Sequence, residues 1–105
     1  MSNLSDKVVG SAGTGLGVGQ TWQDMTASRA KNTNYTNTTG RTIMVSGWFS
    51  DSNTYTITGY IDGVPVAAWY CGASFVYTMN LIVPAGSTYQ VYNSGATLTK
   101  WFELR

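Results

Sequence analysis

The chain has 105 residues, enough for one domain and too few for two of ordinary size. Six Lys and Arg residues against five Asp and Glu residues leave a formal net charge of +1, which excludes the strong positive field that recruits nucleic acid or an anionic membrane. Charged residues make up only 10% of the chain, against about 25% in an ordinary domain. Because 43% of the residues are hydrophobic, we expect part of the apolar surface to face another subunit.

The first 19 residues are polar and then glycine-rich. No helical pattern follows the glycines at 10–19, so we predict a flexible linker over residues 1–19 rather than a phosphate-binding loop. Residues 20–105 form the predicted domain. The start of the chain lacks the apolar segment of a signal peptide, and no apolar run is long enough to span a bilayer. We therefore expect no membrane insertion.

From residue 20 onward, short strands alternate with turn signals, which is typical of a β-sandwich. We predict strands at 21–27, 35–37, 41–49, 54–61, 64–70, 74–83, 89–92 and 98–104. In the third strand, Ile43, Val45 and Phe49 share one face, and Met44 and Trp48 share the other. The pattern predicts an all-β fold, an antiparallel, jelly-roll-like β-sandwich with negligible helix.

Three turn signals give this prediction its detail. Asp62-Gly63 is the clearest hairpin signal, because a two-residue primed turn needs positive φ at both central positions. Pro65 predicts an edge strand or a bulge directly after that turn. Asn93-Ser94-Gly95 predicts a hairpin between the last two strands. Cys71, the single cysteine, is expected to pack in or near the core.

The residues that carry catalysis are sparse. The chain has no histidine, which removes the usual general base and the commonest metal ligand. A glycosidase needs two converging carboxylates, and only Asp24, Asp51 and Glu103 are candidates, since Asp62 is committed to a turn and Asp6 lies in the predicted N-terminal linker. Asp51 in its polar loop is a weak calcium ligand by itself. We expect no enzyme, no metal and no cofactor.

Aromatic residues are better functional candidates. Two polar segments, 50–53 and 71–74, are each flanked by aromatic side chains. Aromatic faces beside short hydrogen-bonding groups suit the apolar faces and hydroxyls of sugars. The candidate residues for binding a receptor or glycan are Trp48, Ser50, Asp51, Asn53, Tyr55, Tyr70 and Tyr77.

Four segments of the chain carry a resemblance to a known family. Residues 18–29 (VGQTWQDMTASR), followed by 35–41 (YTNTTGR), resemble the start of a C-terminal domain of bacteriophage tail fibre proteins. Residues 83–89 (VPAGSTY) and the closing 101–105 (WFELR) resemble the same domain. The resemblance extends from about Gly19 to Arg105, which is nearly all of the predicted domain.

The resemblance implies a receptor-binding tip of a homotrimeric fibre, located in the virion. Such a tip attaches to a bacterial surface glycan, to lipopolysaccharide or to an outer-membrane protein. Host-specific contacts are expected in residues 48–77, which match no family pattern. Residues of the shared motif are not expected to touch the receptor: Gln20, Trp22, Ser28, Arg29, Tyr35, Asn37 and Gly40. Two alternatives are a structural cap that terminates the trimer and a depolymerase.

Overall fold

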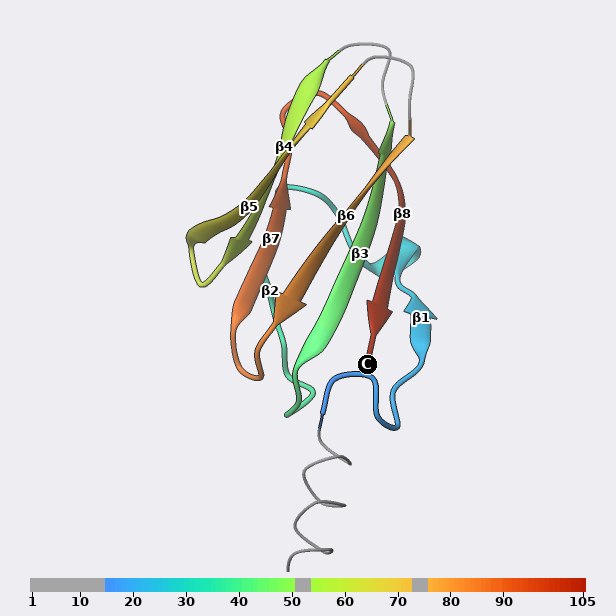
Figure 1. The fold of residues 1–105 in the computed structure, drawn as a ribbon, viewed down its shortest axis with the longest axis vertical. Helices are drawn as coiled ribbons and strands as arrows, with labels where there is room; N and C mark the ends of the chain where they lie inside the picture. The colour runs from blue at the N-terminus through green and yellow to red at the C-terminus, as the bar shows by residue number, and fades with distance from the viewer. Residues whose placement is uncertain (1–14, 51–53, 73–75) are drawn as a thin grey trace, which may run out of the picture.

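The computed structural model describes residues 15–50, 54–72 and 76–105, which form two antiparallel sheets packed face to face (Figure 1). Sheet A has the strand order β1-β8-β3-β6, and sheet B has the order β2-β7-β4-β5. The bounds are β1 Trp22–Asp24, β2 Tyr35–Thr36, β3 Ile43–Ser50, β4 Tyr55–Ile61, β5 Val64–Cys71, β6 Val76–Val83, β7 Thr88–Tyr92 and β8 Thr97–Leu104, with one 3-10 turn, η1 Thr26–Ser28. The predicted all-β sandwich is confirmed.

The core lies between the two sheets and follows the alternation of the strands. In β3, Ile43, Val45 and Phe49 are fully buried, whereas Trp48 is exposed on the outer face of sheet A. Sheet B contributes Ile57 and Val91 from its central strands, and Cys71 is buried as expected. Burial of these apolar side chains between the sheets stabilises the domain without a disulfide.

The hairpin between β4 and β5 has the geometry that its sequence predicts. Asp62 and Gly63 have φ angles of 51° and 78°. The Asp62 carboxylate also accepts hydrogen bonds from Ser87 Oγ and Thr88 N, both at 2.8 Å, and these bonds lower its pKa. The register shifts between Gly59 and Tyr60, opposite Pro65, so the predicted irregularity at the start of β5 is confirmed.

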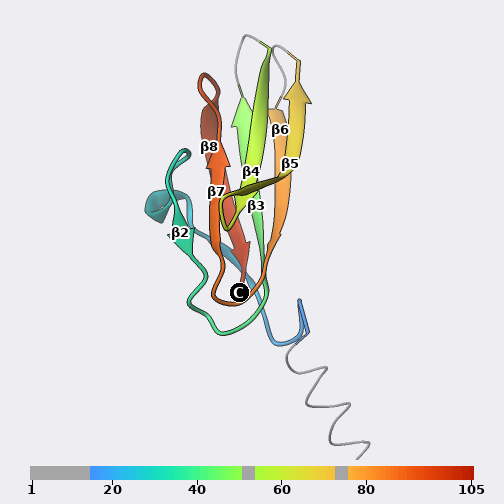
Figure 2. The ribbon, with the colours of Figure 1, turned by 90° about the vertical axis from the view of Figure 1, so that its left-hand side faces the viewer.

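Two predicted elements were wrong in extent or in pairing. The first strand ends at Asp24 rather than at residue 27, because Asp24 Oδ1 accepts hydrogen bonds from Thr26 N at 3.0 Å and Thr26 Oγ1 at 2.6 Å and turns the chain into η1. The last two strands are not a hairpin, since β7 lies in sheet B and β8 in sheet A (Figure 2). Buried Asn93 holds this arch between the sheets by donating to Thr56 O at 2.8 Å and accepting from Gly95 N at 2.8 Å.

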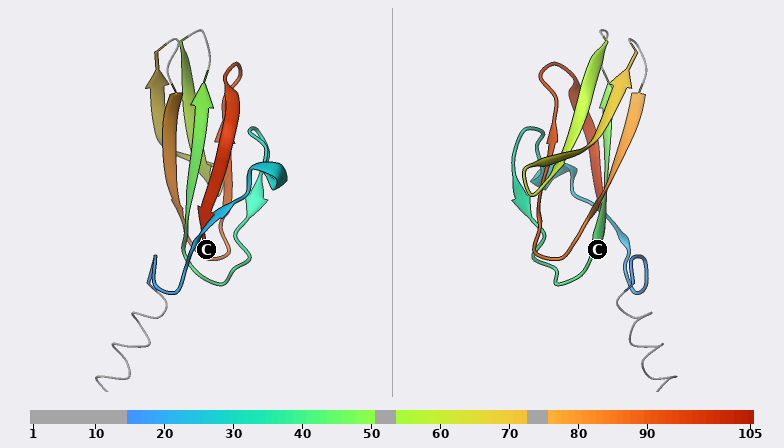
Figure 3. Two further views of the ribbon diagram at one scale, coloured as in Figure 1. Left: turned by 90° about the vertical axis from the view of Figure 1, so that its right-hand side faces the viewer. Right: turned by 60° about the vertical axis from the view of Figure 1, so that its left-hand side comes forward.

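The chain enters the sandwich at the end where it also terminates (Figure 3). Arg41 Nη2 donates to Gly15 O at 2.9 Å and to Val18 O, and Gln20 Nε2 donates to Thr42 O at 2.9 Å. These bonds hold residues 15–20 against the end of sheet A. The rest of the predicted linker, residues 1–14, lies outside the described residues.

Candidate functional site

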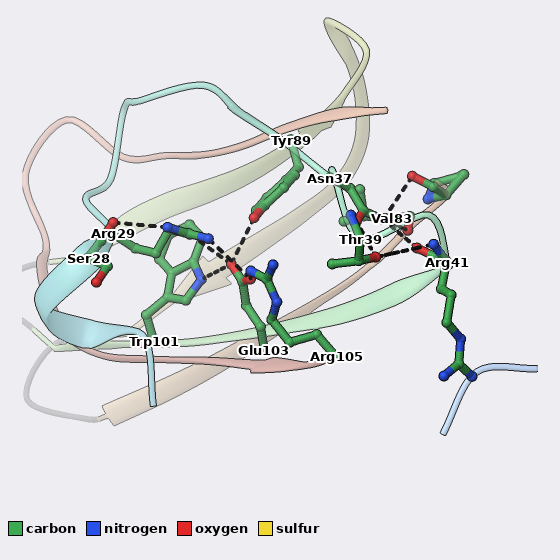
Figure 4. A network of polar contacts seen from close by, with 11 residues as sticks. Ser28, Arg29, Asn37, Thr39, Arg41, Val83, Tyr89, Trp101, Glu103 and Arg105 are labelled. Carbon is green, nitrogen blue, oxygen red and sulfur yellow. Dashed lines mark hydrogen bonds and ion pairs between the residues drawn. The ribbon is translucent and has the colours of Figure 1, made fainter. Parts of the chain in front are cut away.

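A buried carboxylate holds together segments from both sheets (Figure 4). Glu103 is completely inaccessible to solvent. It accepts hydrogen bonds from Arg29 Nε, Tyr89 OH and Trp101 Nε1, each at 2.9 Å, and from Arg105 Nη1 at 2.8 Å. Arg29 also lies over the Tyr35 ring, with its guanidinium carbon 4.7 Å from the ring centroid. Every partner is supplied by the protein, so this network is structural.

The protonation states in this network follow from burial and pairing. Burial alone would raise the pKa of Glu103, but hydrogen bonds from Arg29, Trp101 and Tyr89 outweigh it and lower that pKa. Burial, followed by the hydrogen bond to Glu103, raises the pKa of Tyr89 to about 12. A carboxylate that is ionised at neutral pH and closed off from solvent is a poor general acid or base. Of the other two candidates for a catalytic pair, Asp24 is exposed and Asp51 lies outside the described residues.

Asn37 makes a second buried polar cluster. Its side-chain nitrogen donates to Arg41 O at 2.7 Å and to Val83 O at 3.1 Å, and its oxygen accepts from Thr39 N at 3.1 Å. The bonds join the segment after β2 to the end of β6. Buried amides that are satisfied in this way fix a loop rather than bind a ligand.

The strand ends that flank the two predicted binding segments lie together, opposite the C-terminus (Figure 1). Ser50 pairs with Val76 across β3 and β6, and Tyr55 pairs with Cys71 across β4 and β5. Tyr77 OH accepts a hydrogen bond from Gly72 N at 3.1 Å, which connects the end of β5 to the start of β6. We call this the distal end of the sandwich.

The predicted site residues at the distal end point in different directions. Tyr55 and Tyr77 pack against the core, whereas Tyr70 projects outward from sheet B and is 75% exposed. Ser50 is part of β3 on the outer face of sheet A, and Trp48 lies on that face two residues nearer the opposite end. Asp51 and Asn53 lie outside the described residues. The fold therefore gathers the described candidates near one end, where their side chains face the core, the outer face of sheet A or the outer face of sheet B.

A hollow on the outer face of sheet A is the second candidate. It has a volume of about 310 Å³ and is lined by Trp22, Ser46, Trp48 and Phe102. The Trp48 and Phe102 rings pack at 5.5 Å between centroids with 49° between their planes. Sequence reasoning placed Trp22 in a shared motif and did not foresee this hollow, because its lining comes from three separate segments. Only the strand register brings them together.

The described part of the chain holds neither a cluster of metal ligands nor a helix that could span a membrane. Within residues 15–50, 54–72 and 76–105, no three His, Cys, Asp or Glu side chains gather to hold a metal ion. In the same ranges, no helix has the length and apolar character needed to cross a membrane.

Comparisons of the chain with family models, with curated proteins and with solved structures gave no match. The function is therefore argued from the fold, the two candidate sites and the sequence motifs.

Proposed function

We propose that this domain is the receptor-binding tip of a bacteriophage tail fibre, and that it attaches the virion to a glycan or lipopolysaccharide on the host surface. The observation that carries the proposal is the position of the distal end, which is opposite the end where the chain enters (Figure 1). A chain that arrives from a fibre shaft at one end presents its other end to the cell. The resemblance of residues 18–29, 35–41, 83–89 and 101–105 to tail fibre domains supports the same role.

Tyr70 is the side chain best suited to contact a saccharide. This residue is 75% exposed near the distal end of β5, opposite Thr56. A tyrosine combines a flat apolar face with a hydroxyl and loses little entropy when it is immobilised. In a homotrimer, three such side chains would lie at the same distal end, so weak single contacts would combine through avidity.

The test is binding of the full chain and of the Tyr70→Ala variant to a glycan array, to purified lipopolysaccharides and to outer-membrane preparations from several bacterial species. We expect Tyr70→Ala to weaken single-site binding about tenfold, equivalent to about 1.4 kcal/mol. The control is Tyr60→Ala, which removes an outward tyrosine from the other end of β4, opposite Gln90.

Equal binding by wild type and Tyr70→Ala would exclude the distal tyrosine as the contact. Binding only to outer-membrane protein would replace the glycan with a protein receptor. Release of reducing ends from a bound polysaccharide would make the domain a depolymerase and overturn a purely binding role.

The second candidate is a structural cap that terminates the trimer without a ligand of its own. It is favoured by the apolar outer face of sheet A, where Trp22 and Ile82 are more than half exposed. A cap would show no binding in any arm of the screen, whereas its association would persist. Both candidates require a homotrimer, and a stable monomer at micromolar concentration by sedimentation would contradict both.

A further inference from the structure

Strand β6 ends sheet A with a long, unprotected edge. The edge of a sheet presents unpaired N–H and C=O groups that can pair with another strand, and proteins guard such edges with short strands, proline, bulges or charged side chains. Among the described residues, β6 is the last strand of sheet A on the side away from β1 (Figure 3). All eight of its residues, Val76 to Val83, pair with β3 without a register shift. The strand contains no charged residue, no proline and no glycine.

The edge strands β1, β2 and β5 carry the protection that β6 lacks. β1 has three residues and β2 has two, so each offers only a short ladder to a partner. β5 exposes Val64 and Val66, but Pro65 between them has no backbone N–H, and the register shift opposite it interrupts the pairing. The uninterrupted part of β5 extends only from Ala67 to Cys71. Of the edges in the described part of the chain, β6 is therefore the best suited to accept another strand.

The outward side chains of β6 are apolar at its two ends and polar in its middle. Val76 is 64% exposed and Ile82 is 59% exposed. Thr78 and Asn80 lie between them on the same face and are also exposed. The neighbouring strand β3 adds no charge to this edge, and Lys100 lies on β8, on the far side of β3. A strand that fits this edge is therefore uncharged and has apolar side chains at both ends of the contact.

The β6 strand of a second copy meets this description. In an antiparallel pair of two β6 strands centred on Met79, apolar residues face apolar residues and polar residues face polar residues. The resulting pairs are Val76 with Ile82, Tyr77 with Leu81, and Thr78 with Asn80. Each pair occurs twice, because a two-fold contact uses the same surface of both copies. Directly opposite side chains of matching character stabilise an antiparallel ladder.

We infer that the free edge of β6 pairs with the β6 edge of a second copy and joins the two A sheets into one continuous sheet. An extended strand is the occupant that satisfies the unpaired backbone N–H and C=O groups of this edge. The inference goes beyond the proposed function, which assigns a ligand to the distal end and does not require this contact. The pair is two-fold, so it is distinct from the threefold association of the proposed fibre.

The test places charges at two opposing positions and measures the molar mass of the full chain by sedimentation velocity over a range of micromolar concentrations. We expect wild type to contain two copies, or six if each copy also belongs to a trimer. Thr78→Lys with Asn80→Lys sets lysine against lysine twice, so this double-lysine variant should pair at least about tenfold more weakly. Thr78→Lys with Asn80→Glu sets lysine against glutamate in the same register, and its association should stay within about threefold of wild type.

The matched control is Thr56→Lys with Thr58→Lys. These two positions are on the outer face of β4, which has neighbours on both sides in sheet B. The control adds the same charge as the double-lysine variant and should associate like wild type. Circular dichroism checks that each variant keeps the fold.

A wild type of one or three copies overturns the inference, and so does a double-lysine variant that associates like wild type. If the lysine–glutamate variant is as weak as the double-lysine variant, the register centred on Met79 is wrong and the inference fails. If the control dissociates equally, added charge rather than the edge is the cause, and the inference fails too. The copy number also separates the inference from the proposed function: two copies support the β6 pair and contradict the homotrimer, whereas three copies support the homotrimer and contradict the pair.

Discussion

Replacing Glu103 with Gln keeps the shape of the side chain and removes the charge at the centre of the buried network. The carboxylate forms ion pairs with Arg29 at 2.9 Å and with Arg105 at 2.8 Å, and it also accepts from Tyr89 and Trp101. A Gln amide has one acceptor atom in place of two and turns a donor toward donors.

The loss of stability that we expect for Glu103→Gln depends on how far its two arginine partners are exposed to solvent. Removing one member of a buried ion pair costs about 3–5 kcal/mol, because the remaining charge is left uncompensated. The Arg29 and Arg105 side chains are 15% and 27% exposed, so each regains some hydration when Glu103 is neutralised. We therefore expect Glu103→Gln to lower the free energy of unfolding by about 3 kcal/mol, at the lower end of that range. At about 4–8 °C per kcal/mol, Tm should fall by about 12–24 °C.

The assay is urea unfolding monitored by tryptophan fluorescence at a constant protein concentration, together with a thermal scan. Asp24→Asn is the matched control, since it removes a carboxylate whose partner Thr26 is its neighbour in the chain, and it should unfold close to wild type. If Glu103→Gln and Asp24→Asn unfold at the same urea concentration, the buried network does not stabilise the fold as argued.

The pH dependence of the free energy of unfolding provides an independent check that ionised Glu103 stabilises the fold. The pKa of Glu103 lies below its ordinary value of 4.5 in the folded protein, so its contribution is fully present above about pH 5 and is lost as pH falls through the folded pKa. The gap in stability between wild type and Glu103→Gln should therefore narrow as the solution is acidified below pH 4.5. A gap that stays constant from neutral pH into strong acid would refute ionisation of Glu103 as its source.

Two further predictions concern the packing between the sheets. A Cβ at Gly59 would lie 2.5 Å from Leu81 Cδ2, so Gly59→Ala should destabilise the domain by about 1–3 kcal/mol in urea unfolding. Gly47→Ala, whose Cβ would meet the flexible Met79 Sδ at 3.2 Å, should cost clearly less, and the reverse order would contradict the packing. Cys71 is buried, which raises the pKa of its thiol, so a thiol reagent should label the native protein far more slowly than the denatured protein. Equal labelling rates would show that the end of β5 opens freely.

Local signals were sufficient for most of the strands and for the tight turn at Asp62-Gly63. The alternation of Ile43, Val45 and Phe49 with outward residues is a property of β3 by itself, and burial of the first set follows once any second layer packs on it. Asp62 and Gly63 likewise determine their turn through their own backbone preferences. These features could be predicted because each depends on neighbours in the sequence.

The pairing of strands that are distant in the sequence could not be predicted from local signals. The turn at Asn93 is equally compatible with a hairpin and with an arch between sheets, and buried contacts of Asn93 with Thr56 favour the arch. The Glu103 network had a usable signal that was missed. Trp101 and Glu103 alternate along β8, so burial of Trp101 turns Glu103 toward the core and requires a cationic partner there.

The Glu103 network and the distal end lie in different parts of the sandwich. This separation bears on how the proposed tip could change its target. Glu103 is held by Arg29, Tyr89, Trp101 and Arg105, and none of these lies within residues 48–77. Substitutions at the distal strand ends therefore leave the central charge and its partners untouched. Since distant sites contribute to stability almost additively, a new distal surface costs only its own local packing. A fold built in this way separates the stabilising network from the distal surface, which is the property that the proposed host-binding tip requires.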